Sequence, residues 1–391
     1  MRPLEGITVV SLEQAVAAPF ATRQLADLGA RVIKIERPEV GDFARGYDAA
    51  TRGLSSHFVW LNRSKESLTL DLKTAEAKQV LDRLLAKADI FLQNLAPGAT
   101  ERLGYVTAEM RKKYPRLIIC DLSGYGSTGP YRDKKAYDML VQAETGLIAI
   151  TGTPEMPCKV GISAADIACG MYAYTGILTA LLVREKTGEG VALETSLLDS
   201  LAEWMSYPMY YSFSGSAPPR SGANHAIIAP YGPVASGDNQ TVYIGVQNER
   251  EWKKFCEIVL QKPELTADPR FDRNAKRVQN RAQLDLAMKE VFDKLTAKEI
   301  LARFDAAHIA NARMNTVQEF VEHPQLKARG RWSTVNTAAG PLPALLPPVT
   351  MENVETVMNE VPALGQHTNA ILAELGFDSG TIAEWRRQKM I

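Results

Sequence analysis

The sequence is poor in cysteine and carries no excess charge of either sign. Only four cysteines occur in 391 residues, and none of them forms the CxxC spacing typical of metal sites and redox motifs. Lys plus Arg and Asp plus Glu both number 45, so no basic field favours nucleic acid or a membrane surface. We therefore expect a cytoplasmic protein with reduced cysteines, no disulfide framework, no metal site and no nucleic-acid partner.

Long unbroken hydrophobic runs are also missing. The opening residues, MRPLEGITVV, lack the charged region and apolar run of a secretion signal, and every longer apolar stretch is interrupted. These absences predict a soluble protein with no membrane partner. A chain of 391 residues is too long for one ordinary core, so two or three domains are expected.

The first forty residues predict a βαβ unit, the building block of a parallel sheet. Residues 7–12 and 31–36 are β-branched runs, separated by a helix-like segment that ends at Gly29. No glycine lies between Val9 and Pro19, although a dinucleotide-binding turn needs glycines for the backbone to approach a pyrophosphate. An NAD-dependent dehydrogenase is therefore disfavoured.

The alternation of strands and helices continues to about residue 200, and basic or amide side chains follow successive strands. Further strands are predicted at 67–72, 89–94 and 116–123, and residues 191–199 are predicted to add one more strand and the start of a helix. Ligands of open α/β sheets bind outside the carboxyl ends of the strands, and Arg and Lys there suit phosphate groups. The residues at these ends are Arg37, Lys73, Asn94, Arg102, Lys135 and Tyr137. Each cation alone is equally consistent with a solvated surface side chain.

Asp166 stands at the start of a long apolar helix predicted to end at Gly188. The apolar side chains that follow it have the helical spacing of a buried face. A helix N-terminus offers free N–H groups and a partial positive charge, so Asp166 is predicted to stay ionised. From these residues alone, Asp166 is either an N-cap, the commoner role, or a nucleophile.

The composition changes after residue 200. Residues 1–200 are predicted to form a large α/β domain. Residues 201–220, rich in Met, Tyr, Ser and Pro, are predicted to be an aperiodic linker. In residues 221–322, apolar and polar residues first alternate, as in an antiparallel sheet, and then follow the spacing of amphipathic helices. This pattern predicts a smaller α+β domain. Residues 323–391 form a proline-rich C-terminal segment that ends in short helices.

Several motifs along the whole chain are similar to those of one family. They are LEGITVVSL, ADLGARVIKIERP, NRSKESLTLDLK, NLAPGATERLGY, REKTGEG with the downstream LLDS, and LGQHTNAILAELG. With them the sequence resembles the class III CoA-transferases (CaiB/BaiF family), which include formyl-CoA transferase and carnitine CoA-transferase, with α-methylacyl-CoA racemase as a relative.

The resemblance implies a large doubly wound domain, completed by the C-terminal segment, with a smaller α+β domain inserted. It also implies an interlocked homodimer. The GDFAR and SSHFVWLNRSKESL segments look most like transferases of dicarboxylyl-CoA esters. CoA would pass from succinyl-CoA or another dicarboxylyl-CoA to itaconate, mesaconate or citramalate. Coenzyme A is then a substrate, and no cofactor is bound permanently.

The resemblance further implies roles for individual residues. Asp166 matches the nucleophilic aspartate, which passes through an aspartyl–acyl anhydride and an aspartyl-CoA thioester. Residues matched to the CoA site are Val16 and Ala17 beside the pantetheine, Arg37, Lys73, Arg102 and Lys135 at the phosphates, Leu70, Asn94 and Leu95 around the adenosine, and Tyr137. Candidates for a substrate carboxylate are Arg45, Arg220 and His225, for which a structural role is equally consistent.

Other functions remain open at this point. An acyl-CoA racemase needs a base on each face of the α-carbon, and the resemblance places Tyr137 where racemases carry a histidine. Because a phenol is a poor base at neutral pH, transfer is favoured over racemisation. Intramolecular CoA transfer within one dicarboxylic acid, a thioesterase and a non-catalytic CoA-binding protein are the further alternatives.

Overall fold

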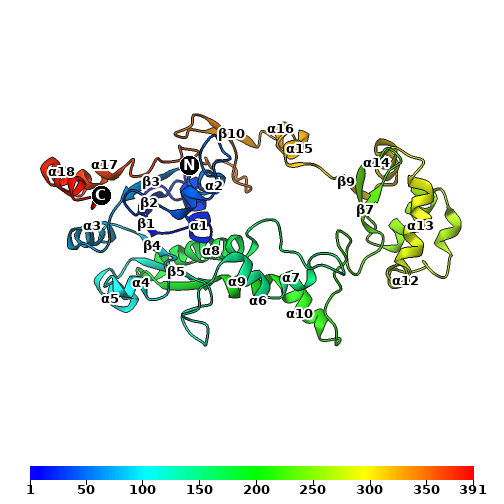
Figure 1. The fold of residues 1–391 in the computed structure, drawn as a ribbon, viewed down its shortest axis with the longest axis horizontal. Helices are drawn as coiled ribbons and strands as arrows, with labels where there is room; N and C mark the ends of the chain where they lie inside the picture. Colours follow the sequence, from blue (N-terminus) through cyan, green and yellow to red (C-terminus); the bar gives the residue numbers. More distant parts are fainter. The chain divides into compact units, whose positions relative to one another are not determined.

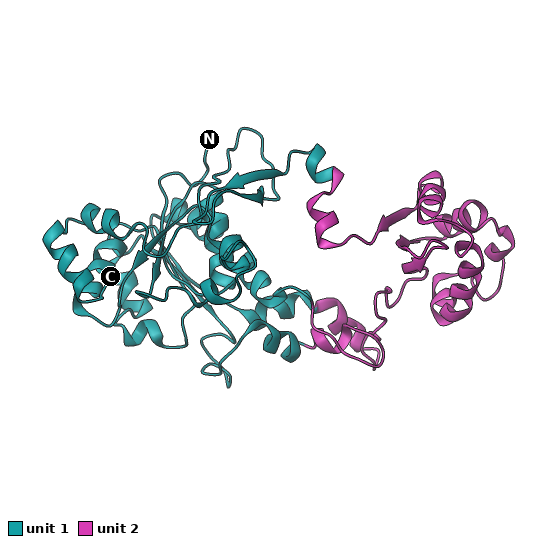
Figure 2. Ribbon diagram, turned by 45° about the horizontal axis from the view of Figure 1, so that its top comes forward, with its two compact units in different colours: residues 1–145, 161–205, 325–391 teal, residues 146–160, 206–324 magenta.

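The computed structural model describes all residues from 1 to 391 and contains two compact units, coloured teal and magenta in Figure 2. Unit 1 comprises residues 1–145, 161–205 and 325–391, and unit 2 comprises residues 146–160 and 206–324. The domain boundaries drawn from the sequence remain a prediction.

Unit 1 is built on a six-stranded parallel sheet with the order β3-β2-β1-β4-β5-β6 (Figure 1). The strands are β1 (Thr8–Leu12), β2 (Arg31–Glu36), β3 (Lys65–Thr69), β4 (Ile90–Gln93), β5 (Ile118–Ser123) and β6 (Ala192–Ser196). Strand β1 pairs in parallel with both β2 and β4, so the strand order reverses beside it. Ligands of such sheets bind at the reversal, outside the carboxyl ends of the strands.

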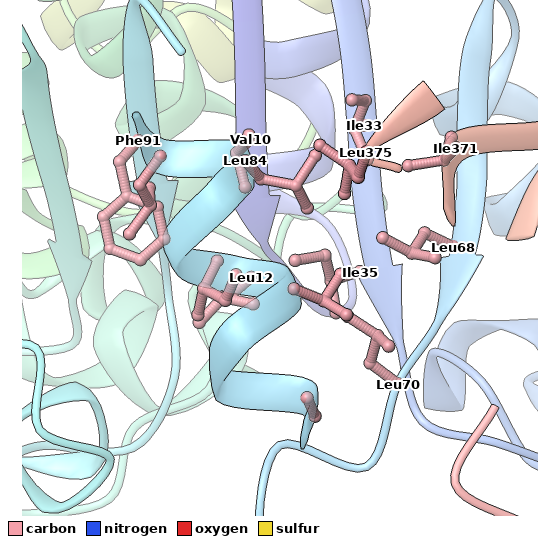
Figure 3. Packing of buried hydrophobic residues seen from close by; sticks show 14 of the residues in the cluster. Val10, Leu12, Ile33, Ile35, Leu68, Leu70, Leu84, Phe91, Ile371 and Leu375 are labelled. Atoms are coloured by element: carbon pink, nitrogen blue, oxygen red, sulfur yellow. The ribbon is translucent and has the colours of Figure 1, made fainter. Parts of the chain in front are cut away.

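Helices cover both faces of this sheet, because alternate side chains of each strand point to opposite sides. On one face, Val10, Leu12, Ile33 and Ile35 pack against helices α3 (Ala75–Leu85), α17 (Thr368–Glu374) and α18 (Ser379–Arg387), as Figure 3 shows in part. On the other face lie α1 (Ala17–Asp27) and α8 (Ala164–Thr187). The doubly wound α/β fold predicted from the sequence is confirmed.

Shorter elements complete unit 1. They are η1 (Phe43–Gly46), α2 (Ser56–Asn62), α4 (Ala99–Arg102), α5 (Thr107–Lys113), α6 (Asp138–Glu144), α9 (Leu197–Trp204) and the antiparallel pair β10 (Trp332–Val335) and β11 (Leu342–Leu345). Phe58 of α2 packs against Val335, Leu342 and Val361, which attaches the C-terminal segment to the N-terminal half of the unit.

Helix α8 is the one helix long and apolar enough to cross a membrane by length and composition. It packs against α1, α6, α9, β5 and β6, and it is therefore a core helix of unit 1. Arg184 and Lys186 lie in its last turn, and Gly188 caps it with a φ of 79°. This C-terminus matches the one predicted from the sequence.

Unit 2 contains a three-stranded antiparallel sheet, β7 (Tyr231–Ala235), β8 (Thr241–Gly245) and β9 (Ala310–Arg313). Its helices are α7 (Leu147–Ile150), α10 (Ser206–Ser212), α11 (Glu249–Lys254), the π-helical η2 (Phe255–Leu260), η3 (Pro263–Thr266), α12 (Asn274–Gln279), α13 (Arg281–Phe292), α14 (Ala297–Ala307) and α15 (Val317–Val321), with α16 (Pro324–Ala328) at the boundary with unit 1. Its core is aromatic, with Trp252, Phe255, Phe292 and Phe304 in contact. This α+β composition agrees with the sequence-based expectation.

The stretch 201–220 differs from the prediction of an aperiodic linker. It carries the end of α9 and the whole of α10. Pro208 obscured α10 in the sequence, but it lies in the first turn, where backbone N–H groups have no partner inside the helix.

Candidate active site

The N-terminus of α8 is capped by a residue of another helix. Ser163 is the N-cap residue, but its side chain makes no capping hydrogen bond. Instead, Oδ1 of Asp138, in the first turn of α6, accepts the N–H of Ala165 at 2.8 Å and the N–H of Asp166 at 3.2 Å. Gln142 donates Nε2 to the other oxygen of Asp138 at 2.7 Å. Asp166 is therefore in the first turn of α8 but is not its cap.

This arrangement changes the electrostatics of Asp166. Its own carboxylate accepts no hydrogen bond within the chain, and burial together with the charge of Asp138 raises the pKa of Asp166 to about 7. The expectation that free N–H groups keep Asp166 ionised is wrong, because Asp138 occupies those groups and adds a like charge. A desolvated carboxylate that is half ionised near neutral pH is a more basic nucleophile than an exposed one.

Tyr47 lies close enough to Asp166 for the two groups to interact electrostatically, and Tyr137 interacts with Tyr47. Burial, with the charges of Asp42 and Asp166 and the phenol of Tyr137, raises the pKa of Tyr47 to about 12. Tyr47 follows η1, and Tyr137 is the N-cap residue of α6 and 65% exposed. Tyr47 therefore remains a protonated phenol beside the carboxylate, and it can donate a hydrogen bond to a charge that develops there.

The first turn of α1 lies against α8 close to Asp166. A Cβ atom added to Gly170, one turn after Asp166, would lie only 2.6 Å from the carbonyl oxygen of Ala17. Val16, the N-cap residue, and Ala17 are buried, and their backbone N–H groups make no hydrogen bond within the chain. The close approach that Gly170 permits thus packs the first turn of α1, with its unpaired backbone donors, against α8 one turn after Asp166.

A fully buried ionic network lies beneath this turn. Lys65 Nζ donates to Glu13 Oε1 at 2.7 Å, and Lys34 Nζ donates to Asp42 Oδ2 at 2.6 Å. Asn62 Oδ1 accepts from both lysines at 3.1 Å and joins the two pairs. Despite burial, which acts in the opposite direction, the two lysines hold the pKa of Glu13 below its ordinary value. Each buried charge has an opposite partner, as ions kept from water require.

Asp42 connects the network to the backbone of the site. Its Oδ1 accepts the N–H of Ala15 at 3.1 Å and the N–H of Ala44 at 2.9 Å. Ala15 has a φ of 63°, a conformation that is unfavourable for an L-residue and needs support from its surroundings. Asp42 thereby fixes both the turn before α1 and η1, which leads to Tyr47.

A cavity of about 680 Å³ opens at the carboxyl ends of β1 to β4. Arg37 follows β2, Leu70 and Lys73 follow β3, and Leu95 follows β4, and all four line it. The rest of the wall is mainly apolar and includes Leu12, Ile35, Val40, Phe43, Leu72 and Leu103. The strand-end pattern in the sequence therefore brings two cations and two leucines together at an apolar cavity suited to a nucleotide.

The remaining CoA-site candidates lie outside the cavity wall. Asn94 Oδ1 accepts the N–H of Gln14 at 2.8 Å and its Nδ2 donates to the Gln14 carbonyl at 2.9 Å, so it fixes the turn after β1. Arg102 ends α4, donates to the Pro97 carbonyl and is exposed. Lys135 is exposed in the loop before α6.

The three residues predicted as candidates for binding a substrate carboxylate have partners within the chain. Arg45 forms a bidentate pair with Glu36, at 2.8 and 2.7 Å, and stacks on Phe58. In unit 2, Arg220 donates to three backbone carbonyls, those of Thr153, Ala149 and Pro154.

His225 is also in unit 2, where its ring stacks on Tyr231 with centroids 5.1 Å apart. Its Nδ1 accepts the Ile227 N–H, so only Nε2 is left for a ligand.

Sequence reasoning did not single out Asp138 or Tyr47. Asp138 begins a helix in the sequence, so its own N-terminus offers an ordinary local role, and the contact to α8 spans 28 residues. Tyr47 follows a loop with no periodic pattern. No group of three or more His, Cys, Asp or Glu side chains is arranged to hold a metal ion.

Comparison with known proteins shows the family of the chain. Residues 4–368 match the model of the CoA-transferase family III. Human succinyl-CoA:glutarate CoA-transferase is 32% identical, over 98% of this chain and 89% of its own length. Succinyl-CoA–D-citramalate CoA-transferase of Chloroflexus aurantiacus is 30% identical, over 100% of this chain and 98% of its own length. Acetyl-CoA:oxalate CoA-transferase of Acetobacter aceti is 36% identical over 84% of each chain.

Solved structures give the same result. A CaiB/BaiF family protein from Brucella suis superposes with a TM-score of 0.83 and 33% identity, covering 95% of this chain and 99% of that one. A Mycobacterium tuberculosis protein superposes with a TM-score of 0.85 and 27% identity over the same shares. With a family match that spans most of the chain, the protein belongs to the CoA-transferase family III and is a CoA-transferase.

Proposed function

We propose that the protein transfers CoA from succinyl-CoA, or another dicarboxylyl-CoA, to a second dicarboxylic acid, with Asp166 as the nucleophile. The observation that carries the proposal is the environment of Asp166: its carboxylate lies in the first turn of α8, accepts no hydrogen bond within the chain, has a raised pKa, and stands one turn before the contact of α8 with α1. Two of the relatives named above use succinyl-CoA with glutarate or D-citramalate. Itaconate, mesaconate and citramalate remain the acceptors we expect, and glutarate joins them.

The reaction is an exchange of acyl bonds without net proton transfer. A carboxylate oxygen of Asp166 attacks the thioester carbonyl, the C–S bond breaks, and an aspartyl–acyl anhydride and CoA thiolate form. The thiolate attacks the aspartyl carbonyl and releases the first acid, leaving an aspartyl-CoA thioester. The acceptor carboxylate then attacks the aspartyl-CoA thioester and releases the CoA thiolate, which gives a second anhydride. The thiolate attacks the acceptor's carbonyl in this anhydride, which forms the new CoA ester and frees the Asp166 carboxylate. This route keeps the thioester energy from being lost to water.

The chain supplies oxyanion stabilisation from two directions. The Val16 and Ala17 N–H groups are unpaired where α1 meets α8, and the phenol of Tyr47 remains a donor at neutral pH. Fixed donors of this kind stabilise the tetrahedral intermediate at each acyl transfer. Asp42, through its bonds to Ala15 and Ala44, holds both sets of donors in place.

The CoA nucleotide would occupy the cavity at the strand ends. Leu70 and Leu95 offer apolar contacts to adenosine, and Arg37 and Lys73 offer charge to phosphates. We propose that Arg102, Lys135 and Tyr137, which are exposed, contact bound CoA from outside the cavity wall. For Arg45 and Arg220 the observed partners support structural roles, and His225 Nε2 remains available for an acceptor carboxylate.

We further propose that the chain acts as the homodimer expected from the family resemblance. Helix α10 exposes large apolar side chains, among them Tyr210 at 66%, and Phe213 just after the helix is 75% exposed. Such a patch supports burial against a second copy. Light scattering at micromolar concentration tests this, with a monomer as the contradicting result.

An acceptor screen tests the substrate proposal. Purified protein is incubated with succinyl-CoA and, separately, glutarate, itaconate, mesaconate, citramalate, oxalate, formate or carnitine, and new CoA esters are identified by mass spectrometry. Esters of dicarboxylic acids, absent with the Asp166→Asn variant, are expected. Exclusive transfer to formate or carnitine would contradict the dicarboxylate specificity. Uptake of α-deuterium from deuterated water, with no new ester, would favour the racemase alternative.

A further inference from the structure

The cavity at the strand ends includes a lysine from the far C-terminal segment. Lys389 lines the cavity together with Arg37 and Lys73, although more than 300 residues separate it from them in the sequence. Its Nζ is 2.8 Å from Oε1 of Glu39, and the two side chains are 73% and 64% exposed. This lysine belongs to no motif by which the sequence resembles the family.

The backbone holds Lys389 in an unusual conformation. Its φ is 57°, in the left-handed region, just after helix α18 ends. Glycine is the common residue at this point of a helix, and the Cβ of a lysine makes the left-handed conformation unfavourable. A strained non-glycine residue beside a cavity is a reason to look for a function of its side chain.

Neighbouring contacts fix the position of this turn. Met390 is buried in the core of unit 1, its N–H donates to the Trp385 carbonyl at 2.9 Å, and its carbonyl accepts the Asp71 N–H at 2.8 Å. Asp71 also lines the cavity and follows β3. The contacts of Met390 thus hold the neighbouring Lys389 next to the end of strand β3 and next to the hydrophobic core.

The present partner of Lys389 is weakly held. An exposed lysine–carboxylate pair contributes little to stability, whereas the phosphate groups of a nucleotide present several negatively charged acceptor oxygens to an ammonium group. Replacing one carboxylate by such a group is therefore favourable for the ammonium group. Glu39 lies on the loop directly after Arg37, so both residues sit at the same edge of the cavity.

We propose that Lys389 exchanges Glu39 for a phosphate group of the bound CoA nucleotide and acts as a third cation of the site with Arg37 and Lys73. The inference rests on the proposed function, because it takes the cavity as the CoA site. The phosphate is either the 3′-phosphate of the ribose or the diphosphate. A comparison of CoA with dephospho-CoA, which lacks the 3′-phosphate, distinguishes the two.

Calorimetry on the full-length protein tests the proposal at one fixed ionic strength. Lys389→Ala is expected to weaken CoA binding about five- to tenfold. Arg387→Ala is the matched control, because Arg387 is an exposed cation two residues away that pairs with Glu384 and does not line the cavity. This control is expected to leave the Kd unchanged, and Glu39→Gln, which frees Lys389, is expected to leave it unchanged or to lower it.

The outcomes separate the inference from the function on which it rests. A loss with CoA but not with dephospho-CoA assigns Lys389 to the 3′-phosphate, and a loss with both assigns it to the diphosphate; either supports the proposal. An unchanged Kd for Lys389→Ala, while Arg37→Ala and Lys73→Ala weaken binding, overturns the role of Lys389 and leaves the CoA site in place. If none of the three variants weakens CoA binding, the cavity is not the CoA site and the role of Lys389 is overturned with it, whereas failure of the proposed transfer shows separately in the acceptor screen.

Discussion

Asp138 caps the helix that carries Asp166, and its Oδ1 accepts the Asp166 N–H at 3.2 Å. The two carboxylates are therefore close enough for their charges to interact, and the pKa of Asp166 rises to about 7 through burial and this second charge. One residue thus caps the helix that carries Asp166 and, in addition to burial, raises the pKa of its carboxyl group.

The first prediction is a pH dependence that Asp138 controls. Because the nucleophile must be ionised, kcat/KM is expected to fall below about pH 7. Asp138→Asn keeps an oxygen for the Ala165 and Asp166 N–H groups but removes the charge, so the acidic limb should move down by about one pH unit. Steady-state rates with succinyl-CoA from pH 5 to 9 measure it. An acidic limb that stays in place would show that Asp138 acts only as a helix cap.

The second prediction concerns stability. Between the ordinary pKa of 3.8 and about 7, folded Asp166 retains a proton that the unfolded chain releases. The wild type therefore loses stability as pH rises through this window, by about 2–4 kcal/mol, and Asp166→Asn does not. Urea unfolding of both proteins at pH 5 and pH 8 isolates the effect. If the free energies of unfolding of the two proteins differed by the same amount at pH 5 and at pH 8, Asp166 would have an ordinary pKa.

The third prediction uses two glycines of α8 as a matched pair. A Cβ at Gly170 would meet the Ala17 carbonyl at 2.6 Å, whereas a Cβ at Gly176 would meet the flexible end of Leu193 at 2.7 Å. Gly170→Ala should cost about 1–3 kcal/mol of unfolding free energy and lower kcat, because α1 and its N–H groups must move. Gly176→Ala gains helix propensity and should be neutral or slightly stabilising. Equal effects of the two substitutions would remove the argument for a close contact near Asp166.

The fourth prediction addresses the buried network. Asp42→Asn leaves the ammonium group of Lys34 without its 2.6 Å carboxylate partner, and should cost about 3–5 kcal/mol. Glu66→Gln removes a pair with Arg31 in which both side chains are about one-third exposed, and should cost less than about 1 kcal/mol. Thermal unfolding of both variants makes the comparison. If both variants lost a similar amount of stability, the buried ion pair would contribute no more than the exposed one.

The sequence predicted those features that depend on short-range patterns. Short strand-like runs followed by Arg37 and Lys73 were enough to place cations at the carboxyl ends of adjacent parallel strands, where the structure has its cavity. The C-terminus of α8 at Gly188 was predictable because its signals, two cations and a glycine, are contiguous.

Features that depend on tertiary contacts were not predictable from one sequence. The cap that Asp138 gives to α8, and the cavity that Lys389 and Lys73 both line, join segments that are far apart in the sequence. The ionisation of Asp166 was misjudged for the same reason, since helix N–H groups were assumed to be free. Arg45 looks like a free cation in the sequence, and only the fold shows its bidentate pair with Glu36.

The central claim is that Asp166 becomes covalently attached to CoA. The direct measurement is rapid quenching of the protein with succinyl-CoA alone, borohydride reduction, and peptide mapping by mass spectrometry. The account predicts reduction of the Asp166 side chain to an alcohol in the wild type, because borohydride reduces an aspartyl thioester but not a free carboxylate. A fully active protein in which Asp166 is never modified, or an Asp166→Asn variant that retains normal turnover, would contradict it.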